Sequence, residues 1–158
     1  MPNAVSLPNP VAELPEVGDL RDQLRRRGVA HTLDSTKLTR ALYSSDASLY
    51  RVVPQAVAHP RTVEEAVAVL EAARAAGMPV TTRGAGTSCA GNAVGPGLVL
   101  DTSRHLTAIT ALDPEARTAT VEPGVVQSSL QVAAAPHGLR FGPAATCSED
   151  WTTPGSTC

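Results

Sequence analysis

Residues 62–94 read TVEEAVAVLEAARAAGMPVTTRGAGTSCAGNAV, and the order of elements in this stretch decides the fold. Thr62 followed three residues later by Glu65 is a capping box, and Gly77 is a stop signal, so the stretch predicts a helix between them. MPVTT then predicts a strand, which leads into a glycine-rich loop. The apolar residues expected to face the core from this helix are Val63, Ala66, Val67, Leu70 and Ala73.

The loop itself, TTRGAGTSCAGNAV (Thr81–Val94), combines glycines, hydroxyl side chains and one arginine with almost no apolar bulk. Glycine tolerates positive φ and has no Cβ, so such a turn at a strand end brings backbone N–H groups close to a phosphate. Two common nucleotide fingerprints fail here. Cys89 stands where the third glycine of a Rossmann fingerprint is needed, and Asn92 and Ala93 replace the lysine and hydroxyl of a Walker A loop.

These failures make nucleotide hydrolysis unlikely as the function of the loop. The remaining interpretations are a pyrophosphate that is held without being cleaved, as in a dinucleotide cofactor, and a purely structural turn. Arg83, Thr87 and Ser88 are the side chains that suit the first.

The flanking sequence predicts a mixed α/β pattern, in which an early strand–helix–strand unit gives way to antiparallel pairing. We expect short helices over Asp19–Arg27 and Ser35–Tyr43, strands over Gln55–Pro60 and Gly97–Ser103, a hairpin around Asp113-Pro114, and a helix over Gly124–Gly138.

Composition restricts the function classes. The chain has 158 residues, which suits one domain, and a formal net charge of −2. No basic block is denser than Arg25–Arg27, which argues against nucleic acid as a partner. The N-terminus lacks a signal-peptide pattern and no stretch reaches the length of a membrane span, so we expect a cytoplasmic protein without a membrane span.

Cysteine and histidine usage bears on the cellular compartment and on metal binding. The three cysteines show no CxxC spacing, which fits a reducing compartment, and the four histidines are scattered. We therefore expect no metal site.

Two quoted stretches carry a family resemblance. They are YSSDASLYRVVPQAVAHPRTVEEAVAVLEAARAAGMPVTTRGAGTSCAGNAV (43–94) and GLVLDTSRHLTAITALDPEARTATVEPGVVQSSLQVAAAPHGLRFGP (97–143). From about Asp19 to Pro143, the chain resembles the FAD-binding domain of the vanillyl-alcohol-oxidase/PCMH type. It is most similar to the branch of the glycolate oxidase FAD subunit and the D-lactate and D-2-hydroxyglutarate dehydrogenases. The resemblance implies an α+β fold, a PCMH-type FAD-binding domain of two α/β subdomains with FAD between them.

The resemblance also implies the cofactor-binding residues. The part of the loop that would wrap the pyrophosphate is Arg83, Gly84, Ala85, Gly86, Thr87 and Ser88, with Gly91 and Asn92 close behind. Some relatives carry a histidine in this loop that bonds covalently to the flavin. None stands between Arg83 and Val94, so we expect non-covalent FAD.

Family members continue after the FGP element (141–143) with further flavin-contacting segments, where this chain has AATCSEDWTTPGSTC. The expected organisation is therefore a flexible leader (1–18), the N-terminal part of the FAD-binding domain (19–143), and an irregular tail (144–158) that a truncated or frameshifted reading frame would explain. The fold is then incomplete at the C-terminus, and no catalytic residue can be assigned.

The leading functional hypothesis is FAD binding within an FAD-linked oxidoreductase that acts on a 2-hydroxy acid of the D-lactate or glycolate kind. The chain alone would lack the catalytic cap, and only a full-length relative would contact the substrate. The alternative is a non-catalytic fragment or interaction module that does not hold FAD, with exposed apolar surface and an open sheet edge. A nicotinamide- or nucleotide-binding domain is weakened by the failed fingerprints.

Individual residues near the loop have more ordinary interpretations. For Arg83, pyrophosphate contact is favoured over capping a strand end. Cys89 is expected to be a small, space-filling loop residue, Asp101 a turn acceptor at a strand end, and Asp46 a local turn acceptor. Arg104 and His105 are expected to lie in a solvated turn.

Overall fold

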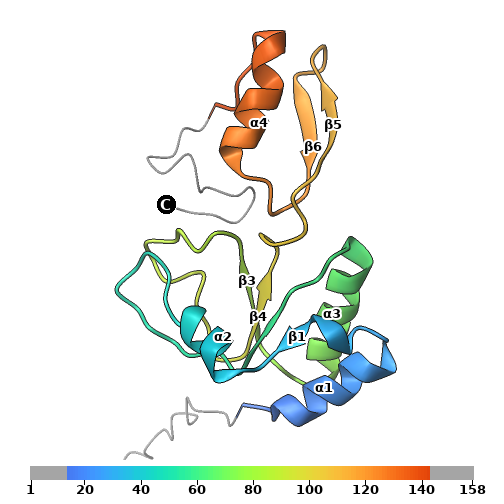
Figure 1. Ribbon diagram of the computed structural model, residues 1–158, viewed down its shortest axis with the longest axis vertical. Coiled ribbons are helices and arrows are strands. Elements are labelled where there is room, and N and C mark those ends of the chain that lie inside the picture. Colours follow the sequence, from blue (N-terminus) through green and yellow to red (C-terminus); the bar gives the residue numbers. More distant parts are fainter. Residues whose placement is uncertain (1–13, 143–158) are drawn as a thin grey trace, which may run out of the picture.

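A computed structural model describes residues 14–142, and the segments 1–13 and 143–158 lie outside the described residues. The described chain forms two lobes (Figure 1). The first contains a four-stranded sheet, and the second contains a two-stranded hairpin packed beside a helix. Most of the leader predicted over 1–18 and the tail predicted over 144–158 fall outside this range, although the first helix already begins at Val17.

The elements have the following bounds. The helices are α1 (Val17–Arg26), α2 (Lys37–Leu42), α3 (Val63–Ala75) and α4 (Gln127–Ala134), with 3-10 turns η1 (Ala30–Thr32) and η2 (Ala135–His137). The strands are β1 (Leu33–Asp34), β2 (Ala56–Ala58), β3 (Val80–Arg83), β4 (Leu98–Asp101), β5 (Ile109–Asp113) and β6 (Thr118–Val121).

The first lobe is built around β4. The strand order is β1-β2-β4-β3, so β4 lies between β2 and β3 and pairs in parallel with both. β1 closes the sheet by pairing antiparallel with β2. The predicted strand–helix–strand unit is thus present as β2-α3-β3, but its two strands are separated by a strand from later in the sequence.

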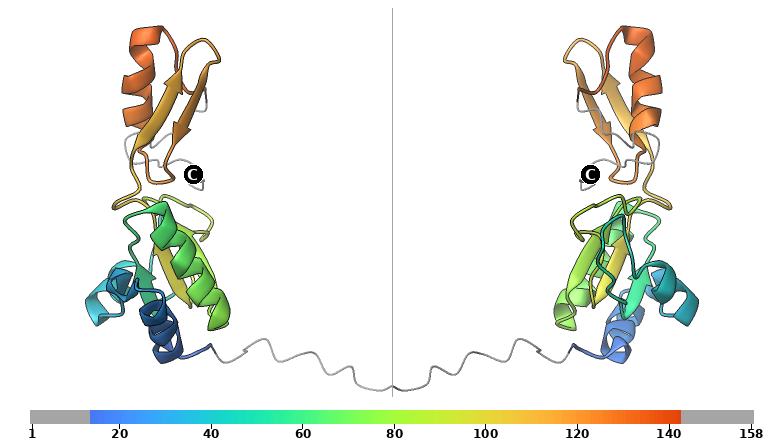
Figure 2. Two further views of the ribbon diagram at one scale, coloured as in Figure 1. Left: turned by 90° about the vertical axis from the view of Figure 1, so that its right-hand side faces the viewer. Right: turned by 90° about the vertical axis from the view of Figure 1, so that its left-hand side faces the viewer.

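Both faces of the two central strands are covered. All residues of β2 and β4 are buried, as expected for parallel strands between layers. Figure 2 shows α1 and α3 on one side of the sheet and α2 on the other. The core on the first side is Leu20, Leu24, Val29, Ala56, Ala58, Val69, Ala72, Ala73, Met78, Leu98 and Leu100.

The predicted apolar stripe of α3 is largely wrong. Val63, Val67 and Leu70 are 55%, 49% and 43% exposed, whereas Val69, Ala72 and Ala73 are buried. The helix has so few polar residues that periodicity could not distinguish its two apolar faces. The face rich in alanine is buried because small side chains let α3 approach α1 and the sheet closely.

The start of α3 is capped, but with one difference from the predicted capping box. The Glu65 amide donates to Thr62 Oγ1 at 3.2 Å, as expected. The Glu65 carboxylate, however, accepts from the amide of Arg61, at 2.7 Å, and not from that of Thr62. It also lies 3.0 Å from His31 Nε2, which ties η1 to the helix.

The second lobe contains the predicted hairpin and helix. β5 and β6 pair antiparallel, and α4 continues through η2 to Gly138, which ends it with positive φ. The lobes join where Gly124 lies against the first lobe. A Cβ on Gly124 would lie 2.2 Å from the carbonyl oxygen of Thr102 and 2.7 Å from that of Leu106, so only glycine permits this approach.

The predicted α+β class is confirmed by this arrangement. The predicted helices and strands are all present, with ends shifted by a few residues, whereas η1 and β1 were not anticipated. Between residues 14 and 142, no helix combines the length and the apolar character needed to cross a bilayer.

The packing of α1 against α3 gives a test of the core. Leu24→Ala should lower the free energy of unfolding by about 3 kcal/mol, because Leu24 is fully buried and its truncation leaves a cavity. Leu49→Ala is the matched control: Leu49 is fully exposed, so a change within about 0.5 kcal/mol is expected. Urea denaturation followed by circular dichroism measures both, and equal losses would contradict this description of the core.

Candidate functional site

The candidate site lies at the carboxyl ends of β3 and β4, where two loops run side by side. The glycine-rich loop follows β3, and the second loop (residues 43–55) connects α2 to β2. The Ala47 amide donates to the Gly86 carbonyl at 3.1 Å, and the Ala93 amide donates to Asp46 Oδ2 at 3.3 Å. Ligands of open α/β sheets bind outside this edge of the strands.

The glycine-rich loop is shaped by bonds within it. Ser88 is buried, and its hydroxyl oxygen accepts from the amides of Ala90 and Asn92 at 3.3 and 3.1 Å. Gly86 adopts a φ of 76°, in the left-handed region that favours glycine. Ser88 therefore organises the loop from inside.

Several donors of the loop are left over after this folding. Within residues 14–142, the amides of Gly86, Thr87 and Ser88 donate to no protein acceptor. The Thr87 hydroxyl is buried and has no partner in the same described part of the chain. Buried polar groups without a hydrogen-bond partner are rare in folded proteins, so such a group indicates a place where a ligand, ion or water binds.

Arg83 lies beneath the loop. Its Nη1 donates to the carbonyls of Ser45 at 2.8 Å and Ala93 at 3.2 Å, one in each loop. A Cβ on Gly86 would lie 2.4 Å from Nη2, so the guanidinium packs directly against the Gly86 backbone. The guanidinium also lies over an aromatic ring, with Arg83 Cζ 5.1 Å from the centroid of the Tyr43 ring.

A buried polar cluster adjoins Arg83. Asp101, which pairs with Arg83 in the parallel register, accepts a short hydrogen bond from the Tyr43 hydroxyl. His59 Nδ1 lies 3.4 Å from the same carboxylate, and the His59 ring meets the Tyr43 ring edge-on, with centroids 5.7 Å apart. No sequence pattern indicates this cluster, because its members are far apart in the chain and only the strand pairing brings them together.

The cluster shifts the pKa of two groups. Burial alone would raise the pKa of Asp101, but hydrogen bonds from His59, Tyr43 and Ser103 outweigh it and hold the pKa at about 2. Burial and the bond to the Asp101 carboxylate raise the pKa of the Tyr43 hydroxyl well above its usual value. At neutral pH the pair is therefore a phenol donating to a carboxylate.

Several individual predictions near the loop are confirmed. Asp101 Oδ1 accepts from the amide and the hydroxyl of Ser103, both at 2.7 Å, as a turn acceptor at the strand end. Asp46 accepts from the Ser48 amide at 2.9 Å, and this bond contributes to lowering its pKa. Arg104 and His105 lie exposed in a turn.

The space-filling role predicted for Cys89 is wrong, because its side chain is exposed. It lies at the rim of the loop and not under it. Its nearest recorded partner is the Thr87 carbonyl, 3.8 Å from the sulfur, which is a weak contact.

A cavity of about 320 Å³ opens beside the loop, between the two lobes. Arg83 and Gly84 form its border with the loop, and Leu106, between β4 and β5, and Pro123, which follows β6, also line it. The cavity thus reaches the start of the loop at Gly84. Among residues 14–142, no group of three His, Cys, Asp or Glu side chains is placed to hold a metal ion.

The structure brings the predicted cofactor-binding residues into one loop. Gly84, Gly86, Thr87, Ser88 and Gly91 lie along it, and Ala85 and Asn92 are its exposed members. Arg83 differs from the others, because both recorded hydrogen bonds of its Nη1 hold protein carbonyls.

Comparison with known proteins places these features in a family. Residues 54–157 match the family model described as FAD binding domain, which covers more than half of the chain. The matched range includes the C-terminal segment predicted to be an irregular tail.

Two curated relatives agree with this match. The chain is 32% identical over 149 residues to D-2-hydroxyglutarate dehydrogenase of Pseudomonas putida, covering 92% of this chain and 14% of that protein. It is 32% identical over 127 residues to the glycolate oxidase subunit GlcD of Bacillus subtilis, covering 79% and 27%. The chain thus spans a small part of the length of the relatives it matches.

A solved structure shows the same fold. Alkyldihydroxyacetonephosphate synthase superposes with a TM-score of 0.74 and 18% identity, over 94% of this chain and 30% of that one. The resemblance to FAD-linked oxidases and the predicted PCMH-type fold are confirmed by these comparisons.

The buried carboxylate of Asp101 gives a pH-dependent prediction. Its pKa is lowered from 3.8 to about 2, so it stabilises the fold above a pH of about 4 and this contribution is lost as the pH falls toward 2. The shift corresponds to about 2 kcal/mol. Asp101→Asn should lower the free energy of unfolding at neutral pH and should also remove this part of its acid dependence.

Urea denaturation at several pH values between about 2.5 and 7 measures the effect. Asp22→Asn is the control, since it makes the same change in charge on the exposed face of α1, where the Asp22 side chain is 63% exposed. An acid dependence identical in the wild type and in Asp101→Asn would show that the cluster does not stabilise the carboxylate.

Proposed function

This chain belongs to the FAD binding domain family, and from that membership we propose that its glycine-rich loop holds the pyrophosphate of non-covalently bound FAD. The observation that carries the proposal is a set of loop donors without a partner among residues 14–142, the amides of Gly86, Thr87 and Ser88 together with the Thr87 hydroxyl. The remaining cofactor-binding residues proposed are Arg83, Gly84, Ala85, Gly91 and Asn92.

The donor set fits a pyrophosphate in its chemistry. Successive backbone amides around a positive-φ glycine form an anion-binding concavity, and a pyrophosphate presents several oxygens that only accept. The Thr87 hydroxyl, which has no acceptor among residues 14–142, would find one there.

Arg83 contributes charge as well as shape. Its guanidinium lies directly against the Gly86 backbone and at the border of the adjoining cavity. A fixed cation immediately under the amides makes the potential at the loop more positive, which favours a dianionic group. Because its Nη1 is used on protein carbonyls, we expect Arg83 to act on the phosphates mainly through this potential and through the shape of the loop.

The adjoining cavity would accept one end of the cofactor. Its lining is mostly apolar, with Leu100, Leu106 and Val63 among the contributors, which suits a flat ring system. Because the cavity borders the loop at Arg83 and Gly84, a single extended ligand would use both. The absence of histidine between Arg83 and Val94 favours a cofactor held without a covalent bond through this loop.

The chemistry proposed for the whole enzyme follows from the relatives. One is named for D-2-hydroxyglutarate and the other for glycolate, and both compounds are 2-hydroxy acids. FAD, when bound, supplies an acceptor for the hydride of such a substrate. The described residues bind and orient the cofactor, and we assign no catalytic residue within residues 14–142. A cytoplasmic location likewise stays a prediction.

FAD binding tests the proposal directly. The purified chain should retain FAD through gel filtration, and Gly86→Ala should raise the dissociation constant at least about tenfold, measured by isothermal titration calorimetry. The added Cβ would meet Arg83 at 2.4 Å in a backbone conformation with positive φ, so the loop must deform.

Gly28→Ala is the matched control. Gly28 also has positive φ, 72°, but nothing lies within 4 Å of the added Cβ, so this variant shares the backbone strain without touching the loop. Its FAD affinity should equal that of the wild type. Thr87→Val should weaken FAD binding about tenfold, whereas Thr107→Val, at an exposed position, should not.

A folded chain that binds no FAD would overturn the proposal. It would favour the second candidate, a non-catalytic interaction module, for which the exposed apolar side chains of Val63, Val67 and Leu70 on α3 are the supporting observation.

A further inference from the structure

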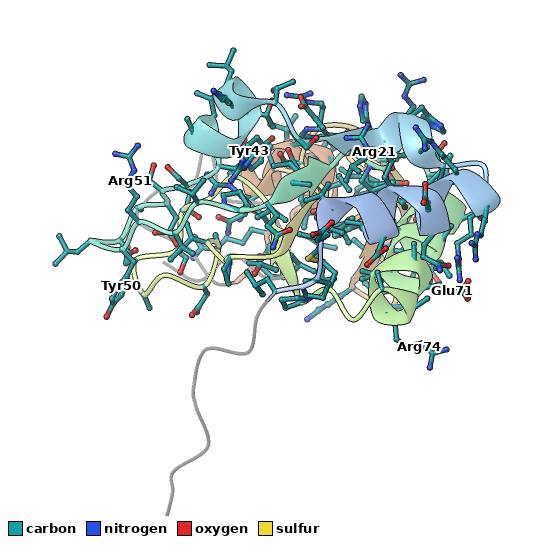
Figure 3. All side chains as sticks on the ribbon, turned by 90° about the horizontal axis from the view of Figure 1, so that it is seen from below. Arg21, Tyr43, Tyr50, Arg51, Glu71 and Arg74 are labelled. Carbon is teal, nitrogen blue, oxygen red and sulfur yellow. The ribbon has the colours of Figure 1, made fainter. Side chains whose placement is uncertain are left out.

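Tyr43 lies outside the glycine-rich loop that we propose to bind phosphate, but it supports that loop through Arg83. Tyr43 follows α2, and the loop begins forty residues later, after β3. Figure 3 shows Tyr43 within the body of the first lobe, whereas Tyr50 and Arg51 project at the far end of the second loop. The chain has two tyrosines, and they have very different surroundings.

The Tyr43 ring is fixed at two points. Its hydroxyl donates to the Asp101 carboxylate, which is 4% exposed and anchored at the end of the central strand β4. The His59 ring lies edge-on to it, with 5.7 Å between the centroids. A phenol that donates to a buried carboxylate makes a stronger bond than one between neutral groups, so the ring has little freedom to rotate away.

Arg83 rests on this ring. Its Cζ lies 5.1 Å from the ring centroid, within the range of a cation–π interaction, and the guanidinium is partly removed from water. The guanidinium therefore lies over the Tyr43 ring, while its Nη1 donates to other partners.

The edge of the guanidinium holds both loops. Nη1 donates to the Ser45 carbonyl in one loop and the Ala93 carbonyl in the other, and the Gly86 backbone packs against Nη2. A rotation of the guanidinium would break its hydrogen bonds to the second loop and to the glycine-rich loop at once. The orientation of the loop amides thus depends on the orientation of Arg83.

We propose that Tyr43 is a positioning residue for the phosphate-binding loop: anchored by Asp101, its ring orients Arg83, and Arg83 holds the loop amides in their binding geometry. The inference rests on the proposed function for its consequence on FAD affinity. Its structural part, that Tyr43 orders the loop, can be tested without any cofactor.

The variant that tests it is Tyr43→Phe, which keeps the ring and removes only the bond to Asp101. In the chain without FAD, the amides of residues 84–92 should exchange with deuterium about tenfold faster, since losing a bond to a charged group loosens what the ring supports. The amides of α1 and α3 should exchange at the wild-type rate. With FAD, the dissociation constant should rise about tenfold.

Tyr50→Phe is the matched control. The Tyr50 ring packs against Gly91 of the same loop, but Tyr50 is 62% exposed and its hydroxyl has no recorded partner in the described chain. Removing that hydroxyl should change neither the exchange of residues 84–92 nor the FAD affinity by more than about twofold.

A double-mutant cycle tests the route through Arg83. Arg83→Lys keeps the charge but loses the planar fork that reaches two carbonyls, so it should loosen the loop as Tyr43→Phe does. If Tyr43 acts through Arg83, the double variant should exchange no faster than Arg83→Lys alone. Additive effects would overturn the proposed route.

Two further outcomes would also overturn the inference. One is a uniform increase of exchange throughout the fold in Tyr43→Phe, which would mean that Tyr43 contributes only to global stability. The other is unchanged exchange in residues 84–92. A wild-type chain that binds no FAD would refute the proposed function alone, because the exchange measurements would still decide whether Tyr43 orders the loop.

Discussion

The insertion of β4 between β2 and β3 is the constraint on which the rest of the structure depends. It pairs in parallel with both neighbours, and all four of its residues are buried. Its apolar residues fill the core between α1, α3 and the sheet, while its last residue, Asp101, is delivered to the edge where the loops lie. One short strand therefore connects the stability of the lobe to the geometry of the candidate site.

The pairing of β3 with β4 places two opposite charges next to each other. Arg83 and Asp101 are register partners at the strand ends, and Tyr43 contacts both, with its ring against the guanidinium and its hydroxyl on the carboxylate. Parallel strands end at the same edge of a sheet, so charged residues at their ends meet without any signal in the local sequence. This arrangement lets a loop with little apolar bulk keep a defined shape.

The family match and the loop geometry support one another from independent directions. The match concerns residues 54–157 and rests on sequence. That the amides of Gly86, Thr87 and Ser88 find no acceptor within the described part of the chain is a property of the folded backbone. The chain spans 14% of the D-2-hydroxyglutarate dehydrogenase that it matches, so its own residues give structural evidence on the cofactor-binding loop and none on a substrate.

The sequence by itself determined what depends on neighbouring residues. Capping and stop signals define α3, alternation and a turn define the β5–β6 hairpin, and the glycine spacing excludes the Rossmann and Walker loops. The FAD-binding domain was indicated by the resemblance of residues 43–94 and 97–143 to a known family. Only the tertiary structure decided which face of α3 is buried, that Arg83 lies under the loop, and that Tyr43 and Asp101 meet. Those outcomes depend on strand order, which joins residues far apart in the chain, and local periodicity carries no information about it.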